Sequence, residues 1–156
     1  MSADDGTPDR TSEHATDRSL DRFVHAQEGV HDQALQELRA GRKRSHWMWF
    51  VFPQLAGLGR SATAQHYAVR DLREARAYLA HPVLGPRLRE AAAVAAAAPA
   101  RSADDLFGGV DAMKARSSMT LFARAADDPA PFRAVLDRWY RGSEDPVTLR
   151  LLGPSD

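Results

Sequence analysis

The segment WMWFVF, residues 47–52, decides the fold class of this chain, because no other stretch has the composition of a β-strand. A strand without a partner leaves its backbone N–H and C=O groups unsatisfied. Helix signals dominate on both sides of the segment. We therefore interpret residues 47–52 as a buried helical turn or an extended link, and we predict an all-α fold in a single compact multihelical domain.

Apolar residues recur at three- and four-residue spacing through most of the remaining chain, which is typical of helices. Phe23, Val30 and Leu38 belong to one predicted helix, which Gly41 is expected to end as a C-terminal cap. Further helices are predicted in residues 86–98, 129–141 and 146–152. The predicted N-terminal caps of other helices are Ser61, Asp71, Ser102 and Asp111.

The composition limits the domain organisation and the functional class. With 156 residues the chain is long enough for one domain, and its 21 basic residues balance its 21 acidic residues. This balance argues against nucleic acid as a partner. The chain has no cysteine, which agrees with a cytoplasmic protein. Residues 1–18 are polar and are predicted to be a disordered tail before a helical domain in residues 19–153, and no segment is apolar enough for a membrane span.

Residues 41–52 combine positive charge with aromatic rings. Arg42 and Lys43 either face water at a helix end or clamp a phosphate group. Trp47 and Trp49 either pack in the core or offer faces on which a planar ligand stacks. His46 is a candidate acid or base near neutral pH.

The sequence GLGRS, residues 57–61, leads into a predicted helix. Gly57, Gly59 and Ser61 either form a simple turn or present backbone N–H groups to an anion. The glycine spacing matches neither a P-loop nor a dinucleotide-binding motif. Gln54 is a candidate for reading a base or amide edge, and Tyr67 is a further candidate ligand contact.

A second candidate cluster lies in DAMKARSS, residues 111–118. Lys114, Ser117 and Ser118 either belong to an ordinary helix or hold a phosphate group or a ribose. Asp111 is expected to cap this helix, and is otherwise the best-placed general base. We predict that Trp47 or Trp49, His46 and Lys114 line one cavity, with His46, Asp111 and Lys114 as candidate catalytic residues.

Several kinds of chemistry lack their sequence signals. No histidine pair has metal-ligand spacing, and no serine lies in a nucleophile elbow, so we expect no metal site, no cofactor and no acyl transfer. Residues 41–70 contain no aspartate or glutamate. A glycosidase with two carboxylates would have to recruit Asp111, Glu28 or Glu74 from other helices.

Four stretches together resemble a known bacterial family, domain of unknown function 1810, some members of which are labelled calpastatin. The resemblance covers about residues 20–153 and rests on matching order and spacing. It implies a compact multihelical cytoplasmic protein and assigns no activity. The stretches are RKRSHWMWFVFPQLAGLGRSATAQHYAV, YLAHPVLGPRL, DAMKARSSMTLF and FRAVLDRWYRG followed by TLRLLG.

The tryptophan segment and MKARSSMTLF are also similar to the plan of the YbiA-like family, which is linked to NAD and ADP-ribose. This more distant resemblance implies ADP-ribose or another N-ribosyl phosphate as the ligand, with cleavage of the N-glycosidic bond as the associated activity. The sequence thus supports two hypotheses. The first is a protein that binds or processes a phosphorylated, nucleotide-like small molecule, and the second is a non-enzymatic adaptor whose aromatic patch binds a protein partner.

Overall fold

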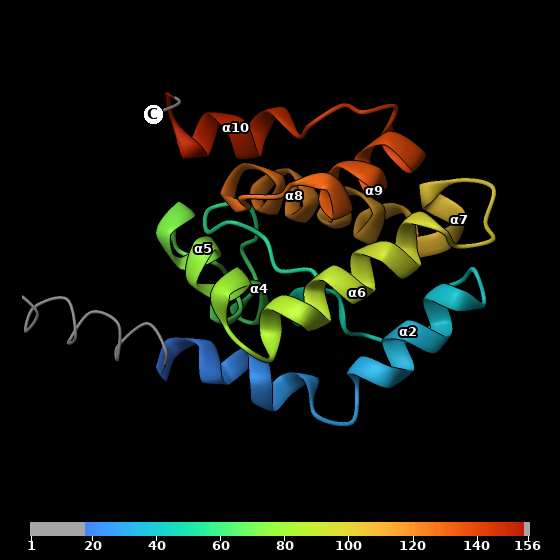
Figure 1. Cartoon of the computed structure of the whole chain (residues 1–156), viewed down its shortest axis with the longest axis horizontal. Helices are drawn as coiled ribbons and strands as arrows, with labels where there is room; N and C mark the ends of the chain where they lie inside the picture. Colours follow the sequence, from blue (N-terminus) through green and yellow to red (C-terminus); the bar gives the residue numbers. More distant parts are fainter. Residues whose placement is uncertain (1–17, 155–156) are drawn as a thin grey trace, which may run out of the picture.

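A computed structural model describes residues 18–154, and they fold into helices without a strand (Figure 1). The first helix occupies residues 18–27. The following helices are α2 (His31–Arg39), α3 (Met48–Val51), α4 (Ala62–His66), α5 (Leu72–Ala80), α6 (Leu84–Ala96), α7 (Ala103–Phe107), α8 (Gly109–Ala125), α9 (Ala130–Tyr140) and α10 (Pro146–Leu152). The all-α prediction is confirmed for these residues, in which the only β pairing is an isolated parallel bridge between Leu55 and Val69.

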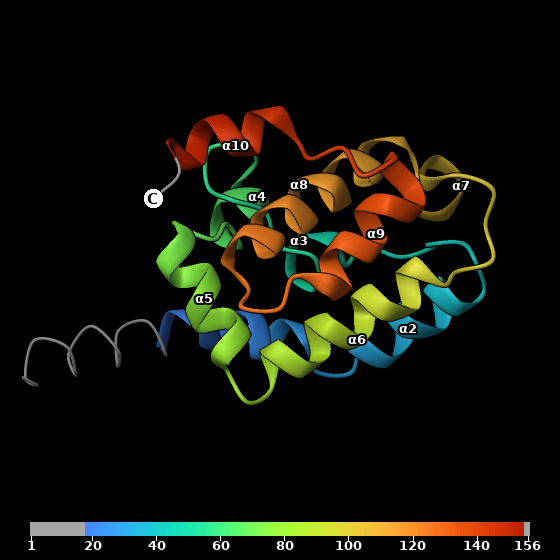
Figure 2. The same cartoon turned by 45° about the horizontal axis from the view of Figure 1, so that its top comes forward.

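The long helix α8 organises the packing. It contacts α3, α5, α7, α9 and α10, while α6 packs against α2, α5 and α9. Figures 1 and 2 place α10 on one side of the molecule, and the first helix and α2 on the other side. The core between them is rich in aromatic side chains, and the largest fully buried ones include Phe23, Trp47, Phe52, Tyr78, Phe122 and Phe132.

The strand-like segment at residues 47–52 contains one helical turn, α3, which is the first of the two predicted alternatives. Trp47, Met48, Val51 and Phe52 are buried. The backbone N–H of Val51 donates to the Trp47 carbonyl at 3.0 Å, and that of Phe52 donates to the Met48 carbonyl at 3.1 Å. The turn therefore satisfies its own backbone groups, which a lone strand in the core could not do.

The predicted helix through Phe23 and Leu38 is two helices, so that prediction is wrong in its extent. The chain turns at residues 28–30, where Gly29 has φ +72°. The apolar spacing continues across the break because both helices face the same core. The C-terminal cap at Gly41 is confirmed, since Gly41 N–H donates to the Leu38 carbonyl and Arg42 N–H to the Glu37 carbonyl, a Schellman motif.

Three predicted N-terminal caps are confirmed and one is wrong. The side chains of Ser61, Asp71 and Ser102 accept hydrogen bonds from the backbone of α4, α5 and α7. Asp111 does not cap α8, which begins after Gly108. Gly108 has φ +87°, and this conformation lets the chain leave α7 and start α8 without a linker. Asp111 therefore lies in the first turn of α8 with its carboxylate free for other partners.

The N-terminal boundary also differs from the prediction. The proposed disordered tail, residues 1–18, lies outside the described residues except for Arg18, which is already helical. No helix within residues 18–154 is long and apolar enough to cross a bilayer.

Candidate functional site

The segment between α2 and α3 is held in place by one buried carboxylate, Glu37, which is 6% exposed. It accepts hydrogen bonds from the backbone N–H groups of Arg44 at 2.7 Å and Ser45 at 3.0 Å, and from the Trp47 indole at 2.9 Å. The Ser45 hydroxyl and the Gln33 amide also donate to it. Glu37 therefore fixes the conformation of the residues that lead to Trp49.

The electrostatics of Glu37 follow from these bonds. Burial alone would raise the pKa of this carboxyl group. The hydrogen bonds from Ser45, Arg44 and Trp47 outweigh burial and lower the pKa of Glu37 to about 2. The group is consequently ionised at neutral pH, and its charge is satisfied by the segment that it holds.

Lys43 and Trp47 lie on the inner side of this segment. Trp47 has no exposed surface, and its ring centroid lies 6.2 Å from that of Phe52. Lys43 has a side chain only 6% exposed, with its Nζ 2.8 Å from Asp111 Oδ2 and 5.0 Å from the Trp47 ring centroid. Lys43 also donates to the Ser45 carbonyl. Both side chains serve the packing of the segment against α8, and Trp47 offers no face to a ligand.

On the outer side, four side chains from the two separate stretches come together. We call His46, Trp49, Asp111 and Lys114 the Trp49 cluster. Lys114 Nζ lies 5.0 Å from the Trp49 ring centroid and 3.6 Å from Asp111 Oδ1. The rings of His46 and Trp49 have centroids 6.5 Å apart and planes 32° apart. Helix α8 supplies the two charged groups, and α3 with the residues before it supplies the two rings.

The charges of the Trp49 cluster are unusual for this chain. The whole chain has only two lysines, Lys43 and Lys114, and both face the carboxylate of Asp111. Lys43 is buried and makes the shorter contact. Lys114 has a longer contact and a side chain 23% exposed. Counted together, Lys43, Asp111 and Lys114 carry one excess positive charge, and Lys114 is about as exposed as Asp111, at 23% and 22%. His46 beside them is exposed.

The sequence matches a family model, and the fold matches a solved structure. A family model described as protein of unknown function (DUF1810) matches residues 17–152. The chain belongs to this family. The crystal structure of the conserved hypothetical protein Rv1873 from Mycobacterium tuberculosis is similar, with 51% identity and a TM-score of 0.84 over 87% of this chain and 97% of that chain. Among curated proteins no match is found.

Other predicted ligand contacts of this DUF1810 member lie elsewhere. Arg42 is exposed and lines a cavity of about 600 Å³ with Lys43, Arg101 and Asp104, away from the Trp49 cluster. Ser117 is buried and donates to the Met113 carbonyl and to Asp145, both at 3.1 Å. Ser118 has no exposed surface, and within the described residues its hydroxyl has no hydrogen-bond partner. The two serines are thus core residues of α8.

The residues around GLGRS have structural contacts in this DUF1810 fold. A Cβ added at Gly59 would lie 2.5 Å from the Ala64 Cβ, so glycine permits close packing on α4. Gly57 has φ +101° and lies next to Leu151 of α10. Ser61 caps α4, a helix of five residues. These contacts favour a simple turn over an anion-binding loop at residues 57–61.

Gln54 and Tyr67 complete the predicted set. The Gln54 carbonyl accepts from Val69 N–H at 2.8 Å, which fixes the chain at the isolated bridge. The Tyr67 ring packs 5.3 Å from that of Phe50 and 5.9 Å from that of Phe23. Both residues are half-buried and hold the loop around α4 on the core.

Sequence reasoning missed Glu37, which organises the segment before Trp49. A single glutamate near the end of an amphipathic helix carries no local signal of burial, because all its donors except Gln33 come from residues seven to ten positions later. Within the described residues, no group of three histidine, aspartate or glutamate side chains lies close enough to hold a metal ion.

Proposed function

We propose that this DUF1810 member is a cytoplasmic protein that binds a phosphorylated, nucleotide-like small molecule at the Trp49 cluster. The most specific form of the proposal is ADP-ribose or another N-ribosyl derivative. The single observation that supports it is the contact of Lys114 with both Trp49 and Asp111, which joins a cation to an aromatic face across two distant parts of the chain.

The aromatic part of the cluster suits a planar ring. Trp49 is half-buried, so its position is fixed by packing while part of its surface meets solvent. Stacking of a base on an aromatic side chain contributes roughly 1–3 kcal/mol. The His46 ring is tilted only 32° from that of Trp49, so the two rings can contact the same planar ligand.

The charged part of the cluster suits a phosphate group. The Lys114 ammonium is partly exposed, and its only carboxylate partner within the described residues is Asp111 at 3.6 Å. Because its contact with Asp111 is long, the ammonium group of Lys114 can donate hydrogen bonds to a further anion. The exposed His46 ring supplies a further N–H donor beside Trp49.

Cleavage of an N-glycosidic bond is the finer form of the proposal, and it would make the protein a hydrolase. Such enzymes commonly use two carboxylates. The Trp49 cluster supplies one, Asp111, whose oxygens face Lys43 and Lys114. We therefore propose ligand binding as the primary function, with Asp111 as the residue that cleavage would require.

A protein-binding adaptor is the second candidate, and one observation favours it. Val110 and Met113 are 68% and 71% exposed at the start of α8, on either side of Asp111 in the sequence. These two side chains lie three residues apart on one helix, so a protein partner that covers both would remove their apolar surface from water. The aromatic residues 47–52 support this candidate less, since Trp47 and Phe52 are buried.

A thermal-shift screen against nucleotides and sugar phosphates tests the proposal. A ligand at a hundred times its Kd stabilises a protein by roughly 2.7 kcal/mol. We expect a phosphorylated, base-containing compound to raise the Tm of the wild-type chain, and to raise it much less in Trp49→Leu and Lys114→Gln. The matched control is Arg39→Gln, an exposed cation on α2. A compound that stabilises all four proteins equally would contradict binding at the Trp49 cluster, and Val110→Ser with Met113→Ser would then test the adaptor.

A further inference from the structure

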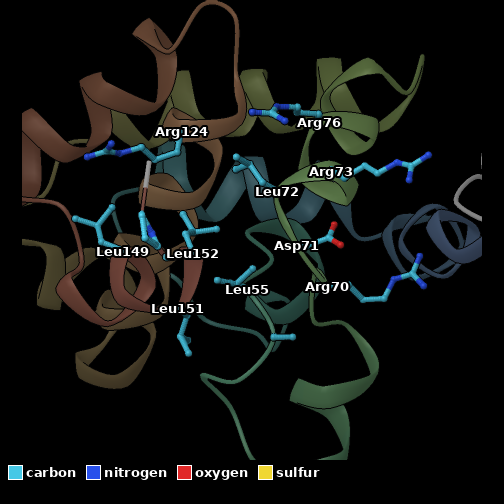
Figure 3. Close-up of a pocket in the computed structure, with 13 residues that line it drawn as sticks. Leu55, Arg70, Asp71, Leu72, Arg73, Arg76, Arg124, Leu149, Leu151 and Leu152 are labelled. Atoms are coloured by element: carbon cyan, nitrogen blue, oxygen red, sulfur yellow. The ribbon is translucent and has the colours of Figure 1, made fainter. Parts of the chain in front are cut away.

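A cleft lies between α5 and α10, two helices that Figure 1 places at the other end of the molecule from α7, and Figure 3 shows residues that line it. It has a volume of about 630 Å³ and is lined by the start of α5, the loop at Leu55 and the residues that end α10. Small-molecule sites commonly have volumes of roughly 300–1,000 Å³. The size of the cleft therefore fits a small ligand.

The floor of the cleft is apolar and comes from three parts of the chain. Leu55 belongs to the loop before α4, Leu72 begins α5, and Leu149 and Leu152 belong to α10. Figure 3 shows Leu55, Leu72 and Leu152 in the middle of the view, with Leu149 to their left. Leu151, which also lines the cleft, is 46% exposed. A ligand with an apolar body would remove this leucine surface from water.

The walls of the cleft are held in position without a ligand. The bridge between Leu55 and Val69 fixes the loop, since Ala56 N–H donates to the Val69 carbonyl at 2.7 Å. Asp71 caps α5 and Asp145 caps α10 through their side chains. A preformed site of this kind loses little conformational entropy when a ligand binds.

The rim of the cleft has an excess of positive charge although the whole chain is neutral. Four arginines line it against a single acid, Asp71. Arg70 pairs with Glu74 at 3.1 Å and Arg124 pairs with Glu144 at 2.7 Å. In contrast, Arg73 and Arg76 make no ion pair or side-chain hydrogen bond with another residue in 18–154. The cleft thus contains two arginines that lack an anionic partner there.

Arg76 is the better placed of these two arginines. In Figure 3 its side chain extends above Leu72 toward the side of the cleft where Arg124 lies, whereas Arg73 extends away from the leucines. A guanidinium group binds carboxylate with two parallel hydrogen bonds. An anionic head group on Arg76 would therefore leave the rest of a ligand over the leucine floor.

We infer that this cleft is a second ligand site, which binds a small amphipathic carboxylate with its head group on Arg76 and its apolar chain on Leu72, Leu149 and Leu152. The site is independent of the Trp49 cluster and shares no residue with it. The site gives a role to the arginine-rich start of α5, which has no recognisable binding motif in the sequence.

Calorimetric titration of the full chain with decanoate tests this inference. Decanol has the same chain without the charge, and butyrate has the same charge with a short chain. We expect decanoate to bind at least tenfold more tightly than either compound, because only decanoate satisfies both the arginine and the leucines. No binding of decanoate, or equal binding of decanol, would overturn the inference.

Variants locate the site. Arg76→Gln should weaken decanoate binding at least tenfold, and Arg76→Lys, which keeps the charge but loses the two-pronged geometry, should weaken it less. Arg39→Gln on α2 is the matched control and should bind as the wild type does. Since these cations are exposed, the variants should keep the wild-type Tm. Unchanged decanoate binding in Arg76→Gln, or an equal loss of decanoate binding in Arg39→Gln, would overturn the site. Trp49→Leu should leave decanoate binding intact.

Discussion

Trp47 and Trp49 are neighbours in the sequence but have different surroundings. Trp47 has no exposed surface and donates its indole N–H to the buried carboxylate of Glu37. Trp49 is half-buried and lies under the ammonium group of Lys114. One helical turn therefore combines a structural tryptophan with a tryptophan that can meet a ligand. The contacts of Trp47 with Glu37 on the inner side fix the position of Trp49 on the outer side.

Removal of the Glu37 carboxylate should have the largest effect on the inner side. Glu37→Gln leaves several of its donors without a charged acceptor, so we expect the free energy of unfolding to fall by about 3 kcal/mol in urea titrations. Glu28→Gln, which changes an exposed glutamate, is the matched control. A fall of less than about 1 kcal/mol in Glu37→Gln would contradict the structural role of Glu37.

Acid should act on the same group. The folded pKa of Glu37, about 2, lies below its ordinary value of 4.5. Its stabilisation is therefore present above pH 4.5 and is lost as the pH falls toward 2, by about 3 kcal/mol in total. Urea titrations at several pH values should show this fall in the wild type. A pH dependence that is equally steep in Glu37→Gln would assign the acid sensitivity to other carboxylates.

The two tryptophans should respond differently to the same substitution. Trp47→Phe loses the hydrogen bond to Glu37 and leaves a cavity, so we expect a loss of about 2 kcal/mol in the free energy of unfolding. Trp49→Phe should lose less than about 1 kcal/mol, because its ring is only half-buried. Chemical unfolding followed by circular dichroism measures both values. Equal losses would remove the distinction between an inner and an outer side.

The smallest effect is expected for the serine pair of α8. Ser118→Ala removes a buried hydroxyl without a partner in the described residues, so the free energy of unfolding should stay the same or rise by up to about 1 kcal/mol. Ser117→Ala removes bonds to Met113 and Asp145 and should lower it by about 1 kcal/mol. The opposite order in thermal unfolding would mean that the Ser118 hydroxyl makes a stabilising hydrogen bond and would contradict its place as an unpaired core group.

Local signals in the sequence predicted most of the fold. Ser61, Asp71, Ser102 and Gly41 end or begin helices through contacts within a few residues, so their positions could be inferred from the sequence. The break at Gly29 was missed because both flanking helices face one core, and the apolar spacing runs on across it.

The candidate site was predictable only in part. The sequence predicts that Trp47 or Trp49, His46 and Lys114 line one cavity. Trp49 contacts both His46 and Lys114, and a shared cavity stays a prediction. Which tryptophan faces inward depends on Glu37, whose burial is decided by tertiary packing. The cleft at Arg76 was not predicted, since its leucines come from three segments that only the folded chain brings together.

The indole N–H signals of the three tryptophans in a proton–nitrogen correlation spectrum test the central proposal most directly. ADP-ribose would be titrated into the full chain, with adenosine as the matched compound without phosphate. We predict that the Trp49 signal shifts with ADP-ribose and much less with adenosine, while the signals of Trp47 and Trp139, which are bonded to Glu37 and the Ala95 carbonyl, stay in place. A Trp49 signal that stays unchanged, or a shift confined to Trp47 or Trp139, would contradict a nucleotide-like site at the Trp49 cluster.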